Sequence, residues 1–165
     1  MFSIRTVTAL LIVAVAFGAT VSPAQEKKTP DLKDVIGVLP KFAIPMREVG
    51  DRFQNMYFAA KAGNWALAYY MSKYMNGAMN PAKITKPDEY PMWSGFYESS
   101  IDPVNKALLA KDFATFEKKY VEAIEGCNAC HTAMGYSFIQ VKRLKAPADQ
   151  GIDYTVKSKA EDVPK

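Results

Sequence analysis

Apolar residues recur every three or four positions along four stretches of the chain, and this spacing predicts amphipathic helices. The first helix is expected at residues 41–62, with Pro45 in its first turn. Its apolar positions are Phe42, Met46, Val49, Phe53, Tyr57 and Ala60. Gly63 suits the left-handed position that ends a helix, and Asn64 is a suitable cap for the next one. Because this connection is short, the first two helices should be antiparallel neighbours.

The second helix is expected at residues 65–79. Its buried side is predicted to carry Leu67, Tyr70, Met71, Tyr74, Met75 and Ala78. Residues 80–91 contain three prolines and show no apolar period, so we expect a loop there. The third helix is predicted at residues 92–110, with a bend where Asp102 precedes Pro103.

Asp112 is well placed to cap a fourth helix. The apolar repeat of that helix includes Cys127 and Cys130, and the pattern allows it to continue past Gly135 to about Val141. No alternation typical of β-strands stands out. Four helices in one chain of this size predict an all-α fold, an antiparallel four-helix bundle.

The N-terminus has the pattern of a secretory signal peptide at residues 1–24. Arg5 is the only charge before Glu26, and an apolar stretch covers about residues 9–21. A retained membrane anchor is the alternative, but the stretch is shorter than the roughly 20 apolar residues of a spanning helix. We therefore predict export to the periplasm, with no membrane span after cleavage.

The rest of the chain, roughly 140 residues, has the size of one domain. We expect a lead-in at residues 25–40, with a short helix from Asp31 to Val38, and the four-helix domain at 41–146. Residues 147–165 alternate charged and small side chains and are expected to be loosely ordered. The net charge of +4 comes from lysines scattered among acidic residues, which does not indicate nucleic-acid binding.

The chemistry-bearing motif is Cys127-Asn128-Ala129-Cys130-His131, which contains both cysteines and the only histidine of the chain. C-x-x-C-H is the attachment motif of c-type haem. Two thiols about one helical turn apart can each add to a vinyl group of one porphyrin, and the adjacent imidazole can bind its iron. The motif predicts one covalently bound haem c on the last helix, with His131 as the proximal iron ligand.

Three alternatives to haem attachment are weaker. A redox-active C-x-x-C is expected beside a strand in a βαβ unit, whereas the flanking sequence here is helical. A zinc site usually takes four nitrogen or sulfur ligands, and this chain has three cysteine and histidine side chains in total. In an oxidising compartment the two thiols could also form a disulfide.

The residues Pro91-Met92-Trp93-Ser94-Gly95-Phe96, together with Phe116 through to His131, resemble the cytochrome c-prime family and its low-spin relatives. That resemblance implies a four-helix bundle with C-x-x-C-H late in its fourth helix. It also implies a homodimer packed through the first two helices. A heterodimer with an unlike partner subunit is equally compatible with the residues. Two features depart from the family. Gly135 stands where a basic residue is common, and some thirty residues follow the motif.

The sixth iron ligand decides the function. With one histidine and no third cysteine, it must be a methionine, a lysine, water or nothing. Met46 is the first candidate, because the first half of its helix faces a haem on the fourth helix, and Gly50 leaves room beside it. Met56 is the second candidate. Met71, Met75 and Met79 form a stripe that we interpret as core.

Two functions follow from the sixth ligand. Methionine ligation predicts a low-spin cytochrome that transfers electrons among periplasmic redox partner proteins and is not an enzyme; this is the function we favour. A five-coordinate iron would instead bind or sense a small gas such as NO or CO. A peroxidase is disfavoured, because no distal histidine is available for acid–base catalysis.

Overall fold

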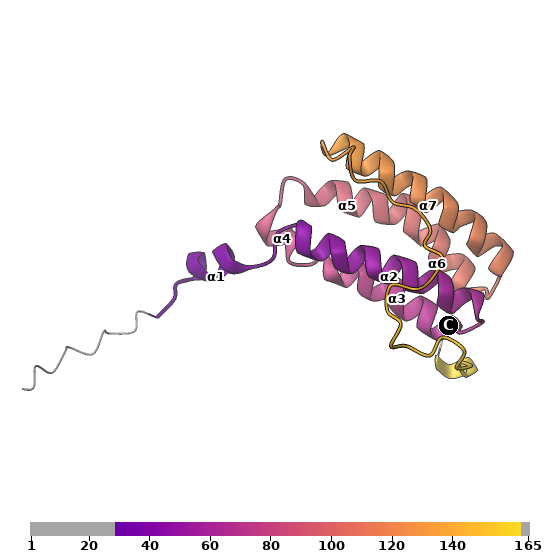
Figure 1. Cartoon of the computed structure of the whole chain (residues 1–165). Coiled ribbons are helices and arrows are strands. Elements are labelled where there is room, and N and C mark those ends of the chain that lie inside the picture. The colour runs from indigo at the N-terminus through magenta and orange to yellow at the C-terminus, as the bar shows by residue number, and fades with distance from the viewer. Residues whose placement is uncertain (1–28, 163–165) are drawn as a thin grey trace, which may run out of the picture.

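The computed structural model describes residues 29–162, and this part of the chain is all-α, without a strand (Figure 1). Its elements are α1 (Leu32–Val38), α2 (Ala43–Lys61), α3 (Trp65–Ala78), α4 (Ala82–Thr85), α5 (Tyr90–Phe96), a π-helical turn η1 (Tyr97–Ile101), α6 (Asp102–Leu109), α7 (Phe113–Ala133) and a short 3₁₀ turn η2 (Ala160–Asp162). The predicted all-α class is confirmed. The predicted signal peptide, residues 1–24, lies outside the described residues. Within residues 29–162, no helix combines the length and the apolar character that a membrane span requires.

The turn between α2 and α3 forms as the sequence predicts. Gly63 adopts φ of 77°, and its amide donates to the carbonyl of Ala60 at 2.9 Å. The Asn64 amide donates to the carbonyl of Ala59 at 2.9 Å, which completes a Schellman motif. The Asn64 side chain then caps α3 by accepting from the Leu67 amide at 3.2 Å. Because the connection is so short, α3 folds back along α2, and these two helices pack together most extensively.

Two residues of α3 do not lie where the apolar pattern predicts. Met71 and Met75 are buried, but Tyr70 and Tyr74 are 47% and 49% exposed. Their rings lie 4.4 Å apart and next to Arg52, whose guanidinium is 5.9 and 5.7 Å from the two ring centroids. An arginine held over aromatic faces gains a cation–π interaction, while the tyrosine hydroxyls stay hydrated. The prediction that these tyrosines face the core is therefore wrong.

The connection between α3 and α5, predicted to be a loop, contains the single helical turn α4. The Thr85 hydroxyl donates to the carbonyls of Pro81 and Pro40, both at 3.2 Å, and so ties α4 to the chain just before α2. α1 packs against α4, has no buried residue, and extends away from the other helices (Figure 1).

The third predicted helix is divided by a wider turn. The Asp102 amide donates to the carbonyl of Tyr97, five residues earlier, which makes η1 a π-helical turn between α5 and α6. Pro103 follows at once, and because it has no amide hydrogen it cannot donate to the Ser99 carbonyl as an α-helix would require. The irregularity thus falls at the predicted bend.

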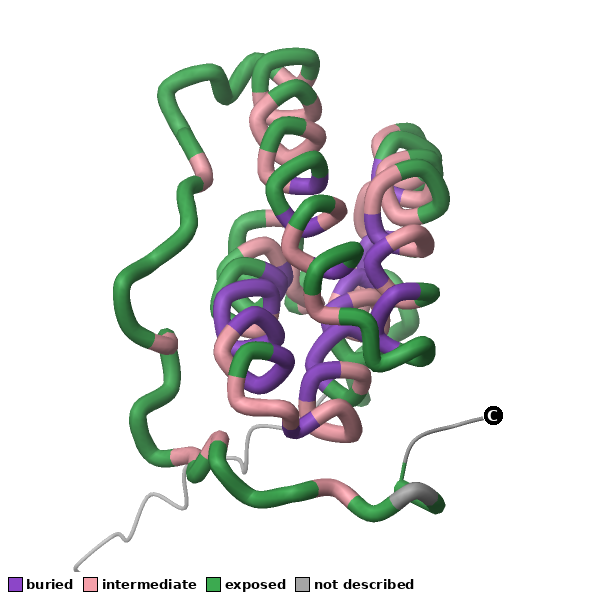
Figure 2. Tube along the Cα trace, turned by 90° about the vertical axis from the view of Figure 1, so that its right-hand side faces the viewer, coloured by how far each residue is buried: buried purple, intermediate pink, exposed green. Residues whose placement is uncertain are grey.

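α7 ends at Ala133 and does not continue to Val141, contrary to the extended helical pattern. Gly135 has φ of +81°, the Gly135 amide donates to the Thr132 carbonyl at 3.1 Å, and the Tyr136 amide donates to the His131 carbonyl at 2.7 Å. This second Schellman motif reverses the chain. Residues 136–144, the return segment, then lead away from the end of α7, and the chain to residue 162 runs down one side of the helices as a largely exposed tube (Figure 2).

The residues predicted to form a loosely ordered tail contact α2 at specific points. The Asp149 amide donates to the Asn55 side chain at 3.0 Å, and the Lys157 ammonium donates to the Ala62 carbonyl at 2.6 Å. Between residues 147 and 162, η2 is the one helical turn that is formed.

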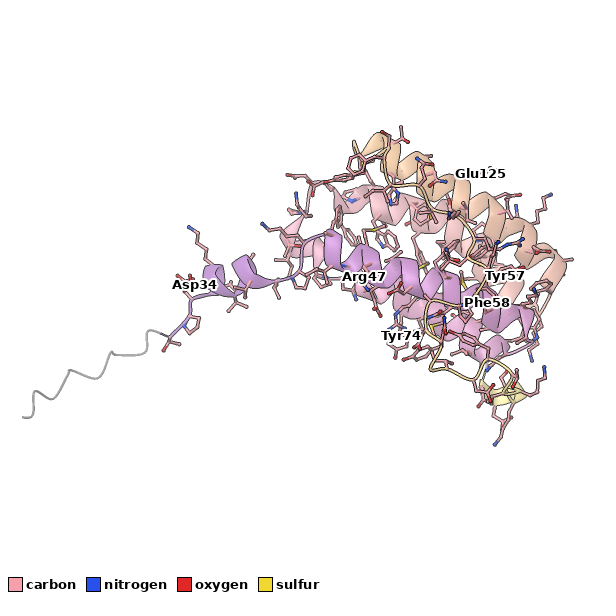
Figure 3. The ribbon with its side chains drawn as sticks, in the orientation of Figure 1. Asp34, Arg47, Tyr57, Phe58, Tyr74 and Glu125 are labelled. Atoms are coloured by element: carbon pink, nitrogen blue, oxygen red, sulfur yellow. The ribbon has the colours of Figure 1, made fainter. Side chains whose placement is uncertain are left out.

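The core centres on aromatic side chains of α2 and α7. Phe53 and Tyr120 stack with ring centroids 4.3 Å apart, and Tyr57 and Phe116 pack beside them. Tyr57, labelled in Figure 3, donates its hydroxyl to Glu117 at 3.0 Å. This tightly packed aromatic cluster fills the interior beside the second half of α2 and the first half of α7, and a cavity lies between the other halves of the two helices.

Candidate functional site

A cavity of about 490 Å³ lies between the first half of α2 and the last turns of α7. Its wall includes Phe42, Met46, Val49, Gly50 and Phe53 of α2 and the segment before it, Met75 and Met79 near the end of α3, Met92, Trp93 and Phe96 of α5, Cys127, Cys130, His131 and Met134 at the end of α7, and Tyr136, Ile139 and Val141 of the return segment. The wall is predominantly apolar. The volume falls within the range of roughly 300–1,000 Å³ that is usual for small-molecule and cofactor sites.

Both thiols of the motif are in this wall. Cys127 and Cys130 are free and half-buried, and they lie about one turn apart on α7. Burial raises the pKa of the Cys127 thiol to about 12, with the neighbouring Cys130 adding to the effect. Burial also raises the pKa of Cys130. A redox-active C-x-x-C pair works through a thiolate of lowered pKa, so these surroundings do not favour the redox alternative.

The imidazole of His131 is held in one orientation by the backbone. Its Nδ1 lies 2.9 Å from the carbonyl oxygen of Ile139. A carbonyl only accepts hydrogen bonds, so Nδ1 carries a hydrogen, and in the neutral ring the lone pair is then on Nε2. Metal-binding histidines are commonly fixed in this way by a backbone carbonyl. His131 is therefore prepared to donate Nε2 to a metal.

The return segment is held against α7 by the motif itself. The Asn128 side-chain amide donates to the Val141 carbonyl at 3.1 Å, and its oxygen accepts from the Val141 amide at 2.7 Å. The two departures from the cytochrome c-prime pattern thus have a structural role here. Gly135 makes the reversal, and the residues after it complete the cavity wall. The sequence interpretation missed Asn128 and Ile139; a glycine so soon after the motif was the available signal for a reversal.

Of the two predicted sixth-ligand candidates, the structure brings one to the cavity. Met46 is half-buried in the cavity wall, on the helix that faces the motif across the cavity. One turn further on, a Cβ added to Gly50 would meet no atom within 4 Å, so the backbone there borders open space. Met56 is fully buried in the core and does not line the cavity.

Further methionines line the cavity, and the sequence interpretation had assigned two of them, Met75 and Met79, to plain core. Met75 and Met79 are almost fully buried and reach the cavity from α3, and Met92 reaches it from α5. Met71, the third member of that stripe, lies elsewhere, with its sulfur 3.9 Å from a guanidinium nitrogen of Arg52. A bound iron would therefore have several thioethers within the same cavity.

Two charged side chains belong to the wall. The Arg47 side chain is 87% exposed, 3.9 Å from Asp51, and projects from α2 (Figure 3). Glu89 pairs with Lys86 at 2.8 Å through one oxygen, while its other oxygen is buried without a hydrogen-bond partner in the described part of the chain. Across residues 29–162, no group of three or more histidine, cysteine, aspartate or glutamate side chains is placed to hold a metal ion.

Comparisons of the chain with models of protein families, with curated proteins and with solved structures found no match. An apolar cavity carries both thiols and the oriented imidazole on one wall, and a glycine opens space beside Met46 on the helix opposite. This donor set and shape fit the group that the motif predicts.

Proposed function

We propose that this chain is a monohaem c-type cytochrome of the periplasm that transfers electrons. Cys127 and Cys130 form the thioether bonds, and His131 binds the iron through Nε2. One observation carries the proposal: the three motif side chains line a single apolar cavity, where the Ile139 carbonyl holds Nδ1 of His131 at 2.9 Å. The bound haem supplies a one-electron iron centre.

The proposal includes the architecture of an antiparallel four-helix bundle formed by α2, α3, the continuous α5–α6 and α7. It is supported by the packing of α2 on α3, α3 on α6, α6 on α7 and α2 on α7. The short turns at Gly63 and Lys111 also suit antiparallel neighbours.

Met46 is the proposed sixth ligand. It lies across the cavity from the motif, and thioether ligation raises the reduction potential of a haem, which suits an electron carrier. The apolar wall would limit water around a bound iron, and Arg47 at the cavity edge would offer a counter-charge for the haem carboxylates.

The cellular setting of the proposal comes from the sequence pattern. Export through the signal peptide at residues 1–24 would bring the chain to the compartment where c-type haem is attached. Its partners there would be periplasmic redox proteins. The resemblance to the cytochrome c-prime family implies a homodimer, and a heterodimer with an unlike subunit is equally compatible with the residues. The exposed pair Tyr70 and Tyr74 on α3 is available for such a contact.

Haem attachment is tested by producing the chain in a bacterium that exports it and matures c-type cytochromes. Intact-mass measurement should show one added haem that survives denaturing extraction. Cys127→Ala together with Cys130→Ala should abolish the covalent addition. A secreted, folded protein that retains two titratable thiols and carries no haem would contradict the proposal.

The sixth ligand is tested on the same haem-loaded protein. The oxidised form should show the far-red charge-transfer band of methionine-ligated ferric haem, and Met46→Ala should remove it. Met56→Ala is the matched control, because Met56 does not line the cavity, and it should keep the band. A high-spin spectrum with immediate CO binding to the reduced wild-type protein would instead support the gas-binding alternative.

A further inference from the structure

We propose that Asn128, one of the two variable residues of the motif, is a positioning residue that holds His131 in the tautomer required for iron binding. The inference rests on the proposed function, but it concerns a role that C-x-x-C-H does not specify, because Asn128 stands at a variable position of the motif. Asn128 acts on His131 through the return segment, in two steps.

The first step is the pairing between Asn128 and Val141. The side-chain amide donates to the Val141 carbonyl at 3.1 Å and accepts from the Val141 amide at 2.7 Å, so it binds both polar groups of one peptide residue. Two such bonds fix the direction of the return segment as well as its distance from α7. The side chain thereby takes the place of a backbone partner.

The second step runs from Val141 back to His131. The return segment is also bound at its beginning, where the Tyr136 amide donates to the His131 carbonyl at 2.7 Å and the Ile139 amide donates to the Tyr136 carbonyl at 2.8 Å. The Ile139 carbonyl lies between this beginning and the pairing at Val141, and it accepts from Nδ1 of His131 at 2.9 Å. Since Asn128 and His131 are three residues apart, they share one face of α7.

The consequence is chemical. A free neutral imidazole prefers the tautomer with hydrogen on Nε2, which would block the nitrogen that binds iron. The Ile139 carbonyl favours hydrogen on Nδ1 and leaves the lone pair on Nε2. A carbonyl at Nδ1 also increases the donor strength of the ring. Without Asn128, the nearest attachment after Ile139 is at Lys142, whose carbonyl accepts from the Gln54 side chain of α2 and so does not hold the segment against α7.

The test uses the mature full-length chain labelled with ¹⁵N at histidine, without haem and in mildly alkaline buffer. Nitrogen shifts should show mainly the Nδ1–H tautomer in the wild type and a shift toward Nε2–H in Asn128→Ala. The Val141 amide should exchange about tenfold faster, as expected for the loss of one hydrogen bond of roughly 1.4 kcal/mol. An unchanged tautomer ratio in Asn128→Ala would overturn the proposal.

Two control variants separate positioning from general stabilisation. Gln140→Ala removes a local bond from the Gln140 amide to the Ser137 carbonyl, 2.7 Å long, within the same segment, and it should leave the tautomer unchanged. Asn128→Asp keeps the acceptor for the Val141 amide but loses the donor, so it should give an intermediate ratio. If Asn128→Ala loses its helical circular dichroism, the Asn128→Asp result decides.

The haem-loaded protein gives a second, independent readout. Weaker donation from His131 should raise the reduction potential of Asn128→Ala relative to wild type, while Gln140→Ala should leave it unchanged. If the haem-free chain is not helical, this comparison decides. A tautomer shift in a chain that takes up no haem would uphold the role of Asn128 and refute the proposed function. Normal haem attachment with an unchanged tautomer and potential would refute the role of Asn128 alone.

Discussion

Gly126, the residue immediately before the motif, faces Phe96 of α5 and Ser100 of η1. A Cβ at this position would come within 2.7 Å of the Ser100 hydroxyl oxygen and 3.2 Å of a ring carbon of Phe96. The first distance is shorter than any normal contact, so Ser100 or the helix itself would have to move. Because Gly126 has no side chain, α7 can pack closely against α5 and η1 next to Cys127.

Gly126→Ala should lower the free energy of unfolding by about 1–2 kcal/mol. Overpacking typically destabilises a protein by about 1–3 kcal/mol, and the better helix propensity of alanine offsets up to about 1 kcal/mol of this loss. Gly95→Ala in α5 is the matched control, because a Cβ there meets nothing within 4 Å, and it should raise stability by about 0.5–1 kcal/mol. Denaturant unfolding of both variants checks this pair. Equal effects would show that α7 has room at Gly126.

At the scale of the element, the start of α7 depends on one carboxylate. Asp112 accepts from the Thr115 amide at 3.1 Å and from the Thr115 hydroxyl at 2.6 Å. These bonds lower the pKa of Asp112 from its ordinary value of 3.8. A lowered folded-state pKa means that the contribution to stability is present above the unfolded value and is lost as pH falls through the folded value.

Asp112→Ala should therefore destabilise the protein at neutral pH, with a lower midpoint of thermal unfolding. The difference from wild type should narrow as pH falls from about 4 through the lowered pKa of Asp112, because the carboxylate that caps the helix becomes protonated. A thermal unfolding series for both proteins measures this. A difference that stays constant down to strongly acidic pH would show that ionisation of Asp112 does not matter for the cap.

The elements that the sequence predicts well are those whose signals are local. Gly63 and Asn64 end one helix and begin the next through bonds that span at most five residues, so their chemistry is visible in a short stretch of sequence. Tyr70 and Tyr74 lie against Arg52, some twenty residues away on another helix, and periodicity does not register this contact. The apolar pattern alone therefore placed them in the core.

The contrast between local signals and contacts of distant residues also applies to the candidate site. The motif and the position of Met46 opposite it follow from residue types and from the order of the helices, and the structure brings both to one cavity. The contacts of the return segment with Asn128 and His131 depend on a reversal at Gly135 and on a segment without helical periodicity. Met79 reaches the cavity because α3 ends beside it, which the stripe of methionines did not reveal.

At the scale of the whole molecule, Gln54 connects the core to the return segment. Its side chain is 6% exposed, donates to the Lys142 carbonyl at 2.8 Å, and accepts from the Leu144 amide at 3.0 Å. The same oxygen accepts from the Tyr120 hydroxyl at 3.2 Å. Burial raises the pKa of Tyr120 well above its usual range, so this hydroxyl remains a donor at any physiological pH. One amide thus joins α2, α7 and the segment that closes the cavity.

Gln54→Ala should lower the free energy of unfolding by about 2–4 kcal/mol, because a buried donor or acceptor left unpaired costs about 1–3 kcal/mol and three partners are affected. The amide of Leu144 should lose its protection from hydrogen exchange before the helices do, since it bonds to this side chain. Gln140→Ala, which breaks an exposed local bond in the same segment, should change stability by less than about 0.5 kcal/mol. If Gln54→Ala instead unfolds the helices and the return segment together, with no earlier loss of protection at Leu144, the segment is part of the cooperative core, and the Ile139 carbonyl that holds His131 is as stable as the helices themselves.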